Sequence, residues 1–184
     1  VTTKYETLDA AIEAAADGDT IKLLTDCSPT KTFYKSLTFT GGHTVTYDVY
    51  GWRYTGNLVL DGANLIVCSD EAMRQADNGE AGKWFSMVLN GSLTAKNGAK
   101  IHFEFDSTYG VNCAIYMVET GTCGIHVESG STFEIFGKNT RGVAGQGIQL
   151  GATANTGIWV SGGSTFLIDG TNRGYVNCPE IHVT

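Results

Sequence analysis

The sequence predicts an all-β solenoid in which short parallel strands stack coil upon coil, with a short capping helix at the N-terminus. Three observations predict this fold class: a fourteen-residue stretch that occurs twice, short apolar triplets spaced at the length of a coil, and a single segment with helical periodicity. The composition agrees, because 24 glycines with only two prolines suit short strands joined by tight turns.

The helix is expected within residues 6–17 of the segment ETLDAAIEAAADGD. Thr7 is a suitable N-cap, Asp9 falls in the first turn, and Gly18 suits the position after the C-cap. The i, i+3, i+4, i+7 spacing of a helix places one narrow apolar stripe on Leu8, Ala11, Ile12 and Ala15. A short amphipathic helix of this kind is expected to cover the first coil.

Two stretches of the chain are nearly the same. Residues 124–137 read GIHVESGSTFEIFG and residues 157–170 read GIWVSGGSTFLIDG, with nine identical positions. We interpret them as successive coils, in which the identical residues point inward or turn a corner. His126 and its counterpart Trp159 then occupy an outward position, where a partner could contact them.

Apolar–variable–apolar triplets form two alternating series. The first comprises VTY (45–47), LIV (65–67), IHF (101–103), IHV (125–127), IWV (158–160) and IHV (181–183). The second comprises LTF (37–39), LVL (58–60), MVL (87–89), IYM (115–117) and IQL (148–150), and a third, less regular series includes FEI (133–135) and FLI (166–168). Because strand side chains alternate, the first and third residues should point inward and the middle one outward. Equivalent strands would pair in parallel about 4.8 Å apart.

This pattern predicts a single domain over residues 1–184, with coils from residue 20 to residue 184 and the longest loops at 69–85 and 138–146. Glycines at the bends would permit sharp corners; they are Gly91, Gly130, Gly137, Gly157, Gly163 and Gly170. An antiparallel β-sandwich is the main alternative. It predicts neither repeats at coil-length spacing nor a helix before the first strand, so the solenoid is favoured.

Composition and charge exclude several classes of function. A net charge of −7 with 12 unclustered basic residues argues against a nucleic-acid partner, and no apolar run reaches the roughly 20 residues of a membrane span. The five cysteines show no C-x-x-C spacing, so we expect no zinc or redox motif. The chain starts without Met and stops inside an apparent strand, so we interpret it as a fragment of a larger multidomain protein. We also expect it to be monomeric.

The opening segment, ETLDAAIEAAADGDTIKLLTD, resembles the start of right-handed parallel β-helix modules of the pectate-lyase-like superfamily. The next segment, GGHTVTYDVYGWRYTGNLVLDGANLIV, is similar to a pattern of surface-displayed, adhesin-type proteins of Gram-positive bacteria. Asp48, Gly51 and Thr55–Gly56 keep the frame of that pattern, whereas VY replaces its usual Leu-Asn. The resemblance implies a right-handed β-helix, secreted and displayed at the bacterial cell surface. Modules of this kind are both enzymes and binding platforms.

The sequence contains no catalytic constellation of the kind that the resemblance implies for an enzyme. The lyases of this fold use Ca²⁺-binding aspartates with a basic Arg or Lys, and its hydrolases use close aspartate pairs. This chain has no Asp-Asp, and its four arginines lie in no recognisable motif. Glu104 and Glu128 each follow directly on a triplet and would fall at equivalent positions, but an acidic solvated surface is the favoured explanation for them. We predict no catalytic residue, cofactor or metal; a carbohydrate-active enzyme, either a polysaccharide lyase or a glycoside hydrolase, is the alternative.

The outward positions of the first series carry three of the four histidines, in the row Thr46, Ile66, His102, His126, Trp159 and His182. Two interpretations of this row remain open: a ladder of rings that stabilises the sheet, and an aromatic surface that contacts a partner. A metal site is disfavoured, because a metal needs converging ligands rather than a straight file.

A second aromatic group lies in YDVYGWRY, where we expect Tyr47 to point inward, and Trp84 follows on a loop. Tryptophan, tyrosine and arginine are enriched at binding hot spots. The candidate binding residues are therefore Tyr50, Trp52, Arg53, Tyr54, Trp84, His102, His126, Trp159 and His182. We expect a non-catalytic binding or display module that engages a glycan or a host or environmental protein, with immunoglobulins and mucins among the candidates.

Overall fold

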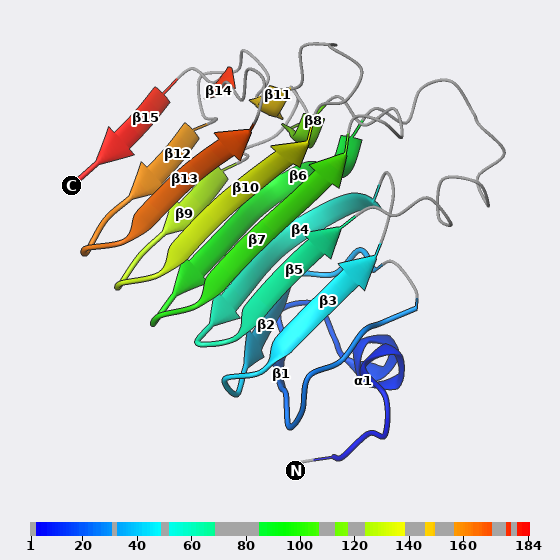
Figure 1. Ribbon diagram of the computed structural model, residues 1–184. Coiled ribbons are helices and arrows are strands. Elements are labelled where there is room, and N and C mark those ends of the chain that lie inside the picture. Colours follow the sequence, from blue (N-terminus) through cyan, green and yellow to red (C-terminus); the bar gives the residue numbers. More distant parts are fainter. Residues whose placement is uncertain are drawn as a thin grey trace, which may run out of the picture.

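The computed structural model describes residues 3–30, 33–48, 52–68, 85–106, 113–117, 124–138, 146–149, 157–170, 176–177 and 180–184. Over these residues the chain forms one short helix followed by two sheets, and every strand pairing within the sheets is parallel (Figure 1). The predicted parallel β fold with an N-terminal helix is therefore confirmed.

Helix α1 spans Leu8–Ala14 and begins as expected, because the Thr7 hydroxyl accepts a hydrogen bond from the backbone N–H of Ala10 at 3.2 Å. Its buried residues are Leu8 and Ile12, from the predicted stripe. The helix ends three residues before the predicted boundary at residue 17. Ala15 is already extended, with ψ of 142°. The ammonium group of Lys35 satisfies three carbonyl oxygens at this end, those of Ile12 (2.8 Å), Glu13 (3.0 Å) and Ala15 (2.6 Å).

Sheet B is a single ladder of five strands in the spatial order β13-β10-β7-β5-β3. Its strands are β3 (Thr44–Asp48), β5 (Asn64–Cys68), β7 (Lys100–Asp106), β10 (Thr132–Lys138) and β13 (Thr165–Gly170). In register, Val45 pairs with Leu65, Leu65 with Ile101, Ile101 with Phe133, and Phe133 with Phe166. The ladder therefore links residues more than 120 positions apart through one inward-facing row.

Sheet A contains ten strands. They are β1 (Thr20–Lys22), β2 (Leu37–Thr40), β4 (Trp52–Asp61), β6 (Phe85–Lys96), β8 (Cys113–Met117), β9 (Gly124–Val127), β11 (Gln146–Gln149), β12 (Gly157–Val160), β14 (Val176–Asn177) and β15 (Glu180–Val183). The sheet divides along the long strand β6, whose first half pairs with β8 and whose second half pairs with β9. We call the two resulting parts ladder 1 (β1, β2, the second halves of β4 and β6, β9, β12 and β15) and ladder 2 (the first halves of β4 and β6, β8, β11 and β14).

Two glycines mark the middle of the long strands. Gly56 and Gly91 pair with each other and have φ values of 136° and 144°, a region that side-chain-bearing residues rarely adopt. A Cβ on Gly91 would lie only 1.8 Å from the carbonyl oxygen of Gly56. Glycine is thus required here both by the backbone conformation and by the close approach of the neighbouring strand.

The chain visits the ladders in a fixed order, so that each three-strand unit contributes one strand to ladder 1, one to sheet B and one to ladder 2. The strands β9, β10 and β11 form one such unit, and β12, β13 and β14 form the next, paired with it in parallel. These two units contain the duplicated fourteen-residue stretch. The prediction that its two copies are stacked neighbours is confirmed.

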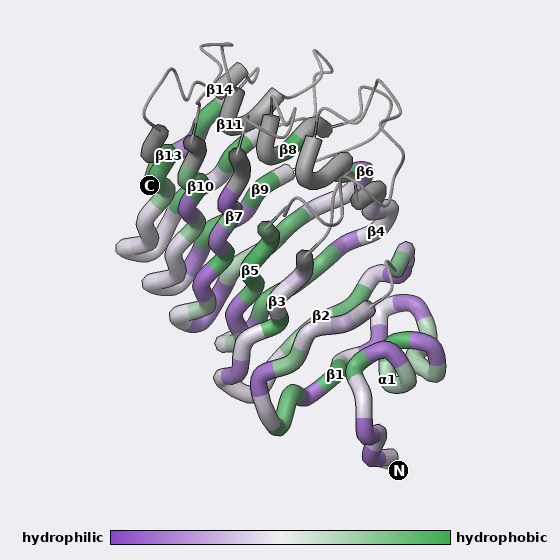
Figure 2. Tube along the Cα trace, turned by 45° about the vertical axis from the view of Figure 1, so that its right-hand side comes forward, coloured by the Kyte–Doolittle hydropathy of each residue, from purple (hydrophilic) through white to green (hydrophobic). Residues whose placement is uncertain are grey.

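The predicted alternation of inward and outward residues is also confirmed along the described strands. Buried residues occupy the first and third positions of the triplets, among them Val45, Tyr47, Leu65, Val67, Ile101, Phe103, Ile125, Val127, Ile158 and Val160. Hydropathy alternates accordingly along the strands of sheet B (Figure 2). Exceptions are Ile181 and Val183 of β15, which are 55% and 75% exposed, and Glu134, a middle residue that is nonetheless buried. Phe166 and Ile168 of β13 are only partly buried.

The assignment of triplets to series was wrong. The first series is split, because 45–47, 65–67 and 101–103 lie in sheet B whereas 125–127, 158–160 and 181–183 lie in ladder 1. The second series is split as well: 37–39 and 58–60 lie in ladder 1, and 87–89, 115–117 and 148–149 lie in ladder 2. All three ladders carry the same apolar–variable–apolar pattern, so the pattern does not distinguish them.

Two further observations concern the expected loops and the length of the helix. Of the expected long loops, 69–85 and 138–146, all but the flanking strand residues lie outside the described residues. Among the described residues, no helix is long and apolar enough to cross a membrane.

Candidate binding surfaces

The aromatic group around residue 50 is only partly described. Tyr50 and Trp84 lie outside the described residues, as do the side chains of Trp52 and Arg53. The backbones of these last two residues belong to β4, where they pair with Met87 and Val88 of β6. The candidate contact surface formed by these four residues therefore stays a prediction.

Tyr54 was wrongly expected on that surface. Its side chain is fully buried, with the ring 5.4 Å from that of Phe33 and the hydroxyl donating to the carbonyl oxygen of Lys35 at 2.5 Å. The reason is its register, because Tyr54 pairs with Leu89, an inward residue of ladder 2. Burial raises the pKa of the Tyr54 hydroxyl, and the nearby Asp17 carboxylate adds to this effect.

The outward row of ladder 1 ends in three stacked rings, which we call the aromatic stack: His126, Trp159 and His182. The imidazole of His126 and the indole of Trp159 are 4.6 Å apart between centroids and inclined by 6°. The indole and the imidazole of His182 are 5.6 Å apart and inclined by 1°. Because the three rings lie on adjacent strands, the two faces of the indole are turned toward imidazoles. The edge of the indole is therefore the part of Trp159 that solvent reaches.

Gly124 makes room for this stack. A Cβ on Gly124 would lie 2.7 Å from Cζ3 of Trp159 and 2.8 Å from Nε2 of His126, so both rings lean back over the glycine. Gly157, expected at a bend, instead begins β12 and pairs in register with Gly124. The sequence does contain the signal for this arrangement, since a glycine stands two positions before the ring in both copies of the repeat.

Burial also changes the chemistry of the stack. Desolvation lowers the pKa of His126, and the Glu128 carboxylate opposes this effect without reversing it. The imidazole of His126 is therefore neutral over a wider pH range than an exposed histidine. A neutral ring presents one hydrogen-bond donor and one acceptor at its edge.

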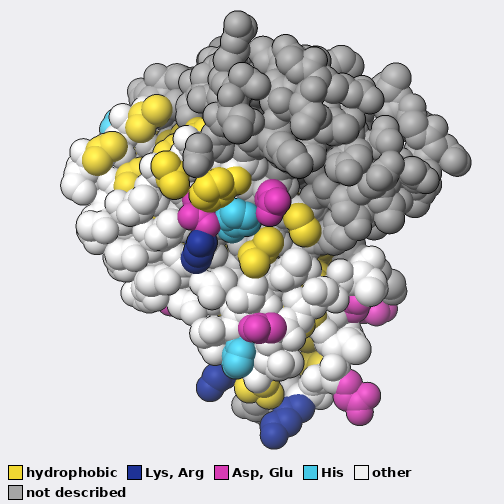
Figure 3. All heavy atoms as spheres, in the orientation of Figure 1, with side chains coloured by type: hydrophobic (Ala, Val, Ile, Leu, Met, Phe, Trp, Pro, Cys, Tyr) yellow, Lys and Arg dark blue, Asp and Glu magenta, His cyan; other side chains and the backbone are white. Residues whose placement is uncertain are grey.

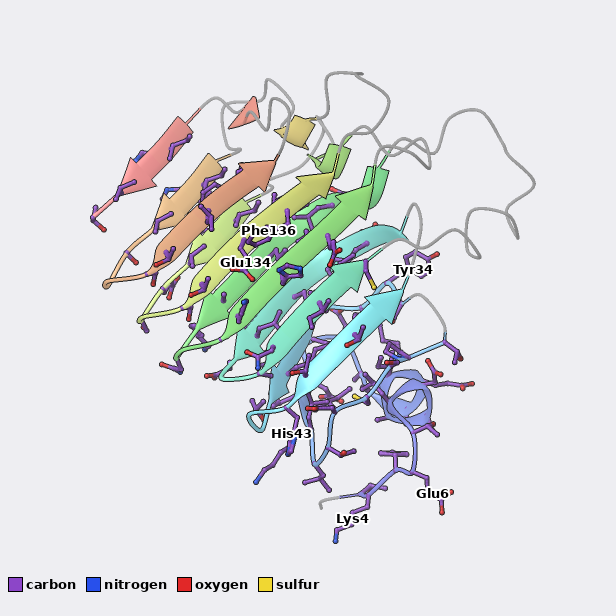
Figure 4. The ribbon with its side chains drawn as sticks, viewed as in Figure 1. Lys4, Glu6, Tyr34, His43, Glu134 and Phe136 are labelled. Carbon is purple, nitrogen blue, oxygen red and sulfur yellow. The ribbon has the colours of Figure 1, made fainter. Side chains whose placement is uncertain are left out.

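His102 does not belong to the same row as the other two histidines, contrary to expectation. It lies in sheet B, where it pairs with Ile66 on one side and Glu134 on the other. There it is part of a group of side chains that we call the sheet B cluster: Lys100, His102, Glu104, Glu134 and Phe136. Figure 4 shows Glu134 and Phe136 on the outer side of β10.

The polar members of the sheet B cluster hold one another in place. Nδ1 of His102 is 2.8 Å from Oε1 of Glu134, and the Lys100 ammonium group forms a close ion pair with the same oxygen. On the other side, Nε2 of His102 is 3.7 Å from a carboxylate oxygen of Glu104. The imidazole ring also lies 5.3 Å from the ring of Phe136. The cluster thus joins β7 to β10 through charged side chains on the outer surface.

Glu134 is unusual because it is a carboxylate with only 9% of its surface exposed. Burial tends to raise its pKa, but the hydrogen bonds and positive charge supplied by Lys100 and His102 outweigh burial, and the pKa is lowered. The ionised carboxylate can only accept, which assigns the imidazole hydrogen to Nδ1 of His102. Sequence reasoning missed Glu134, although it is the middle residue of the FEI triplet and therefore an outward position.

Glu104 and Glu128 are not at equivalent positions, as had been expected. Glu104 pairs with Phe136 in sheet B, whereas Glu128 follows β9 in ladder 1, where its N–H donates to the carbonyl oxygen of Ala95. The two carboxylates therefore do not converge on one face.

Charged and apolar side chains gather on the outer face of sheet B (Figure 3). The view shows one histidine between two acidic side chains, with a basic side chain below and hydrophobic side chains around them.

Among the described residues, no group of three or more His, Cys, Asp or Glu side chains is arranged to hold a metal ion. No protein-family model, curated protein or solved structure matches the chain.

Proposed function

We propose that the chain is a non-catalytic binding module, built as a right-handed parallel β-solenoid and displayed outside a bacterial cell. The parallel pairing of successive three-strand units and the N-terminal helix support a solenoid. The resemblance of residues 6–26 to parallel β-helix modules also supports this fold, and the similarity of residues 41–67 to a pattern of surface-displayed, adhesin-type proteins supports display. A rigid stack of parallel strands is suited to presenting outward side chains at fixed spacing.

The aromatic stack is the observation that carries the proposal. Aromatic rings at outward positions offer large contact areas, and stacking has already restricted their rotation, so binding them costs little further entropy. Since neighbouring rings cover the indole faces, the partner contacts the ring edges, where the N–H groups of Trp159 and the histidines meet hydrogen-bond acceptors. Carbonyl-rich protein surfaces and hydroxyl-rich glycans both supply such acceptors, which leaves host proteins such as immunoglobulins or mucins and glycans as the partner classes.

A binding screen with matched variants tests this function. The purified chain is screened against host glycoproteins and a glycan array, and each ligand found is titrated with Trp159→Thr and with Val59→Thr. Val59 lies in the same outward row, three strands before Trp159. We expect Trp159→Thr to weaken binding by about tenfold or more, as for a hot-spot residue, and Val59→Thr to leave it unchanged. A folded Trp159→Thr variant with full affinity would show that the stack only stabilises the sheet.

One observation favours a carbohydrate-active enzyme as the second candidate. Glu134 is ionised and held by Lys100 and His102, which suits a fixed base, and Glu104 is its diagonal neighbour across β7 and β10. Diagonal strand neighbours are about 7–8 Å apart, similar to the carboxylate spacing in inverting glycosidases. Release of reducing ends or unsaturated sugars from a polysaccharide panel, lost in Glu134→Gln, would establish this function and overturn the non-catalytic one.

A further inference from the structure

The imidazole of His102 lies between two carboxylates, which approach its two nitrogens differently. Nδ1 is 2.8 Å from Oε1 of Glu134, at hydrogen-bond distance, whereas Nε2 is 3.7 Å from Oε2 of Glu104. A separation of 3.7 Å is too long for a direct hydrogen bond. The space between Nε2 and Glu104 is therefore where this group of side chains can take up a further atom.

The hydrogen bond to Glu134 determines what Nε2 offers to that atom. Oε1 of Glu134 also forms a close ion pair with the ammonium group of Lys100, so it belongs to a carboxylate, which can only accept hydrogen bonds. The hydrogen of the neutral imidazole is then on Nδ1 of His102, and Nε2 carries a lone pair. The exposed Glu104 carboxylate is an acceptor as well. Two acceptors thus face each other, and a cation placed between them satisfies both.

A divalent metal ion meets the requirements of this space. Zinc binds imidazole nitrogen and carboxylate oxygen at about 2.0–2.2 Å, which at a tetrahedral angle places the two ligand atoms about 3.4 Å apart. The observed 3.7 Å is close to this separation, and the Glu104 side chain, which is 70% exposed, can move to close the difference. A metal-bound histidine almost always donates its other ring N–H, often to a carboxylate. Glu134 already supplies that carboxylate.

The surroundings hold the imidazole in place and keep the space accessible. His102 and Glu104 are two positions apart on β7, so both side chains lie on the outer face of sheet B. The ring of Phe136 lies 5.3 Å from the imidazole and limits its movement. Lys100 offsets the charge of Glu134, which leaves the charge of Glu104 to attract a cation.

We propose that His102 and Glu104 bind a divalent transition-metal ion such as Zn²⁺ on the outer face of sheet B, and that Glu134 is the positioning residue that orients the imidazole. Among the described residues, no third His, Cys, Asp or Glu side chain is placed to complete the pair. Water therefore fills the remaining positions of the ion. With two protein ligands the ion is held less tightly than in a closed four-ligand site, and it exchanges with solution.

This site is independent of the proposed binding function, because His102 and Glu104 lie on a different sheet from the aromatic stack. The two proposals can therefore fail separately. Trp159→Thr should leave the zinc affinity unchanged, and Glu104→Gln should leave the affinity for a ligand of the aromatic stack unchanged.

The experiment is a titration of the whole, isotope-labelled chain with zinc chloride at neutral pH, followed by NMR of the histidine rings. Ring resonances are used because zinc also binds thiols, and the chain has five cysteines. We expect the His102 resonances to shift and to saturate with one ion per chain. His43 is the matched comparison, since its Nδ1 lies 3.5 Å from a carboxylate oxygen of Asp26 at an exposed position. It should need at least about tenfold more zinc, because no buried carboxylate orients its ring.

Two outcomes of this titration would overturn the proposal. The first is an unchanged His102 spectrum at millimolar zinc. The second is an equal response of all four histidines, which would indicate adventitious binding to imidazole.

Variants then assign the roles within the site. Glu104→Gln removes one of the two ligands and should weaken zinc binding at His102 by about tenfold or more, and Glu134→Gln should weaken it by about tenfold to a hundredfold. Glu128→Gln removes the same charge from ladder 1 and should change nothing. The ring nitrogen shifts also report the tautomer, which we expect to be fixed in the parent chain and mixed in Glu134→Gln.

Circular dichroism first establishes that each variant is folded. Glu104 is exposed, so Glu104→Gln keeps the proposal testable even if Glu134→Gln does not fold. Unchanged zinc affinity in Glu104→Gln would overturn the site, because the imidazole alone would then bind the ion. Unchanged affinity and tautomer in a folded Glu134→Gln variant would overturn the positioning role.

Discussion

The indole of Trp159 lies over Gly124 of the neighbouring strand, so closely that a Cβ on this glycine would be 2.7 Å from the ring atom Cζ3. The glycine and the ring come from the two copies of one repeated stretch, and they meet because Gly124–Val127 pairs in register with Gly157–Val160. A small residue in one copy thus provides the space that a large residue in the other copy occupies. The consequence can be measured.

Gly124→Ala should lower the free energy of unfolding by about 1–3 kcal/mol, because the new methyl group overpacks the site beneath two rings. Chemical denaturation gives this value directly. Gly124→Ala should cost less stability in a chain that also carries Trp159→Thr than in the parent chain, since the smaller side chain at position 159 leaves space for the new methyl group. Additive effects of the two substitutions would contradict the proposed contact.

The pKa of His126 makes stability depend on pH. Burial lowers this pKa below the ordinary value of 6.5, so the unfolded chain takes up a proton at a higher pH than the folded one. The stabilisation is fully present above about pH 6.5, and it is lost as pH falls from there through the pKa of the folded state. His126→Gln should remove this part of the pH dependence, as measured by urea unfolding between pH 5 and pH 8. An NMR titration that places the His126 pKa above 6.5 would reverse the sign and contradict the prediction.

Glu134 should contribute to stability in a more acidic range. Its pKa is lowered by Lys100 and His102 in spite of burial, so its contribution is present above the ordinary value of 4.5 and is lost as pH falls below it. Glu134→Gln keeps the shape but removes the charge-assisted hydrogen bonds, and we expect a loss of about 1–3 kcal/mol at neutral pH. Glu104→Gln is the control, because that carboxylate is exposed and should contribute less than about 1 kcal/mol. Equal losses in the two variants would argue against a special role for the buried carboxylate.

Lys35 is expected to hold the end of helix α1 in place. Its ammonium group donates to three carbonyl oxygens at the helix terminus, where a cation also interacts favourably with the helix dipole. Lys35→Met should therefore lower the free energy of unfolding by about 1–3 kcal/mol. Lys22→Met removes an exposed lysine of β1 and serves as the matched control. If both variants unfold at the same denaturant concentration, the hydrogen bonds of Lys35 carry no net stability.

The paired glycines in the middle of β4 and β6 should tolerate no side chain. Gly91→Ala would force a methyl group against the Gly56 carbonyl oxygen and hold alanine at a φ of 144°, so we expect a loss of more than about 4 kcal/mol or no soluble protein. Gly98→Ala is the comparison, because Gly98 has a φ of 75° but no atom within 4 Å of the new Cβ. It should cost only about 1–3 kcal/mol of backbone strain. Soluble yield and thermal unfolding distinguish the two.

Much of the fold could be predicted from local patterns. The spacing of Leu8 and Ile12 with the Thr7 cap determined the helix, and the apolar–variable–apolar triplets determined which strand residues are buried, Tyr47 among them. Both patterns involve only a few neighbouring residues. The periodicity of the helix or of the strand then fixes the direction in which each side chain points. The repeat in residues 124–137 and 157–170 determined which two units stack, because nine identical positions admit only one alignment.

The candidate surfaces depended on information that no local pattern contains. Every ladder carries the same triplet, so the tertiary structure alone decided that His102 belongs with Glu134 and Phe136, and that His126 belongs with Trp159 and His182. It likewise decided that Tyr54 is buried, through pairing with Leu89 of a strand 35 residues away. The sequence determined which residues face outward, since that follows from the two-residue period of a strand. Which outward residues become neighbours follows from the register between strands distant in the chain, and only the folded structure sets that register.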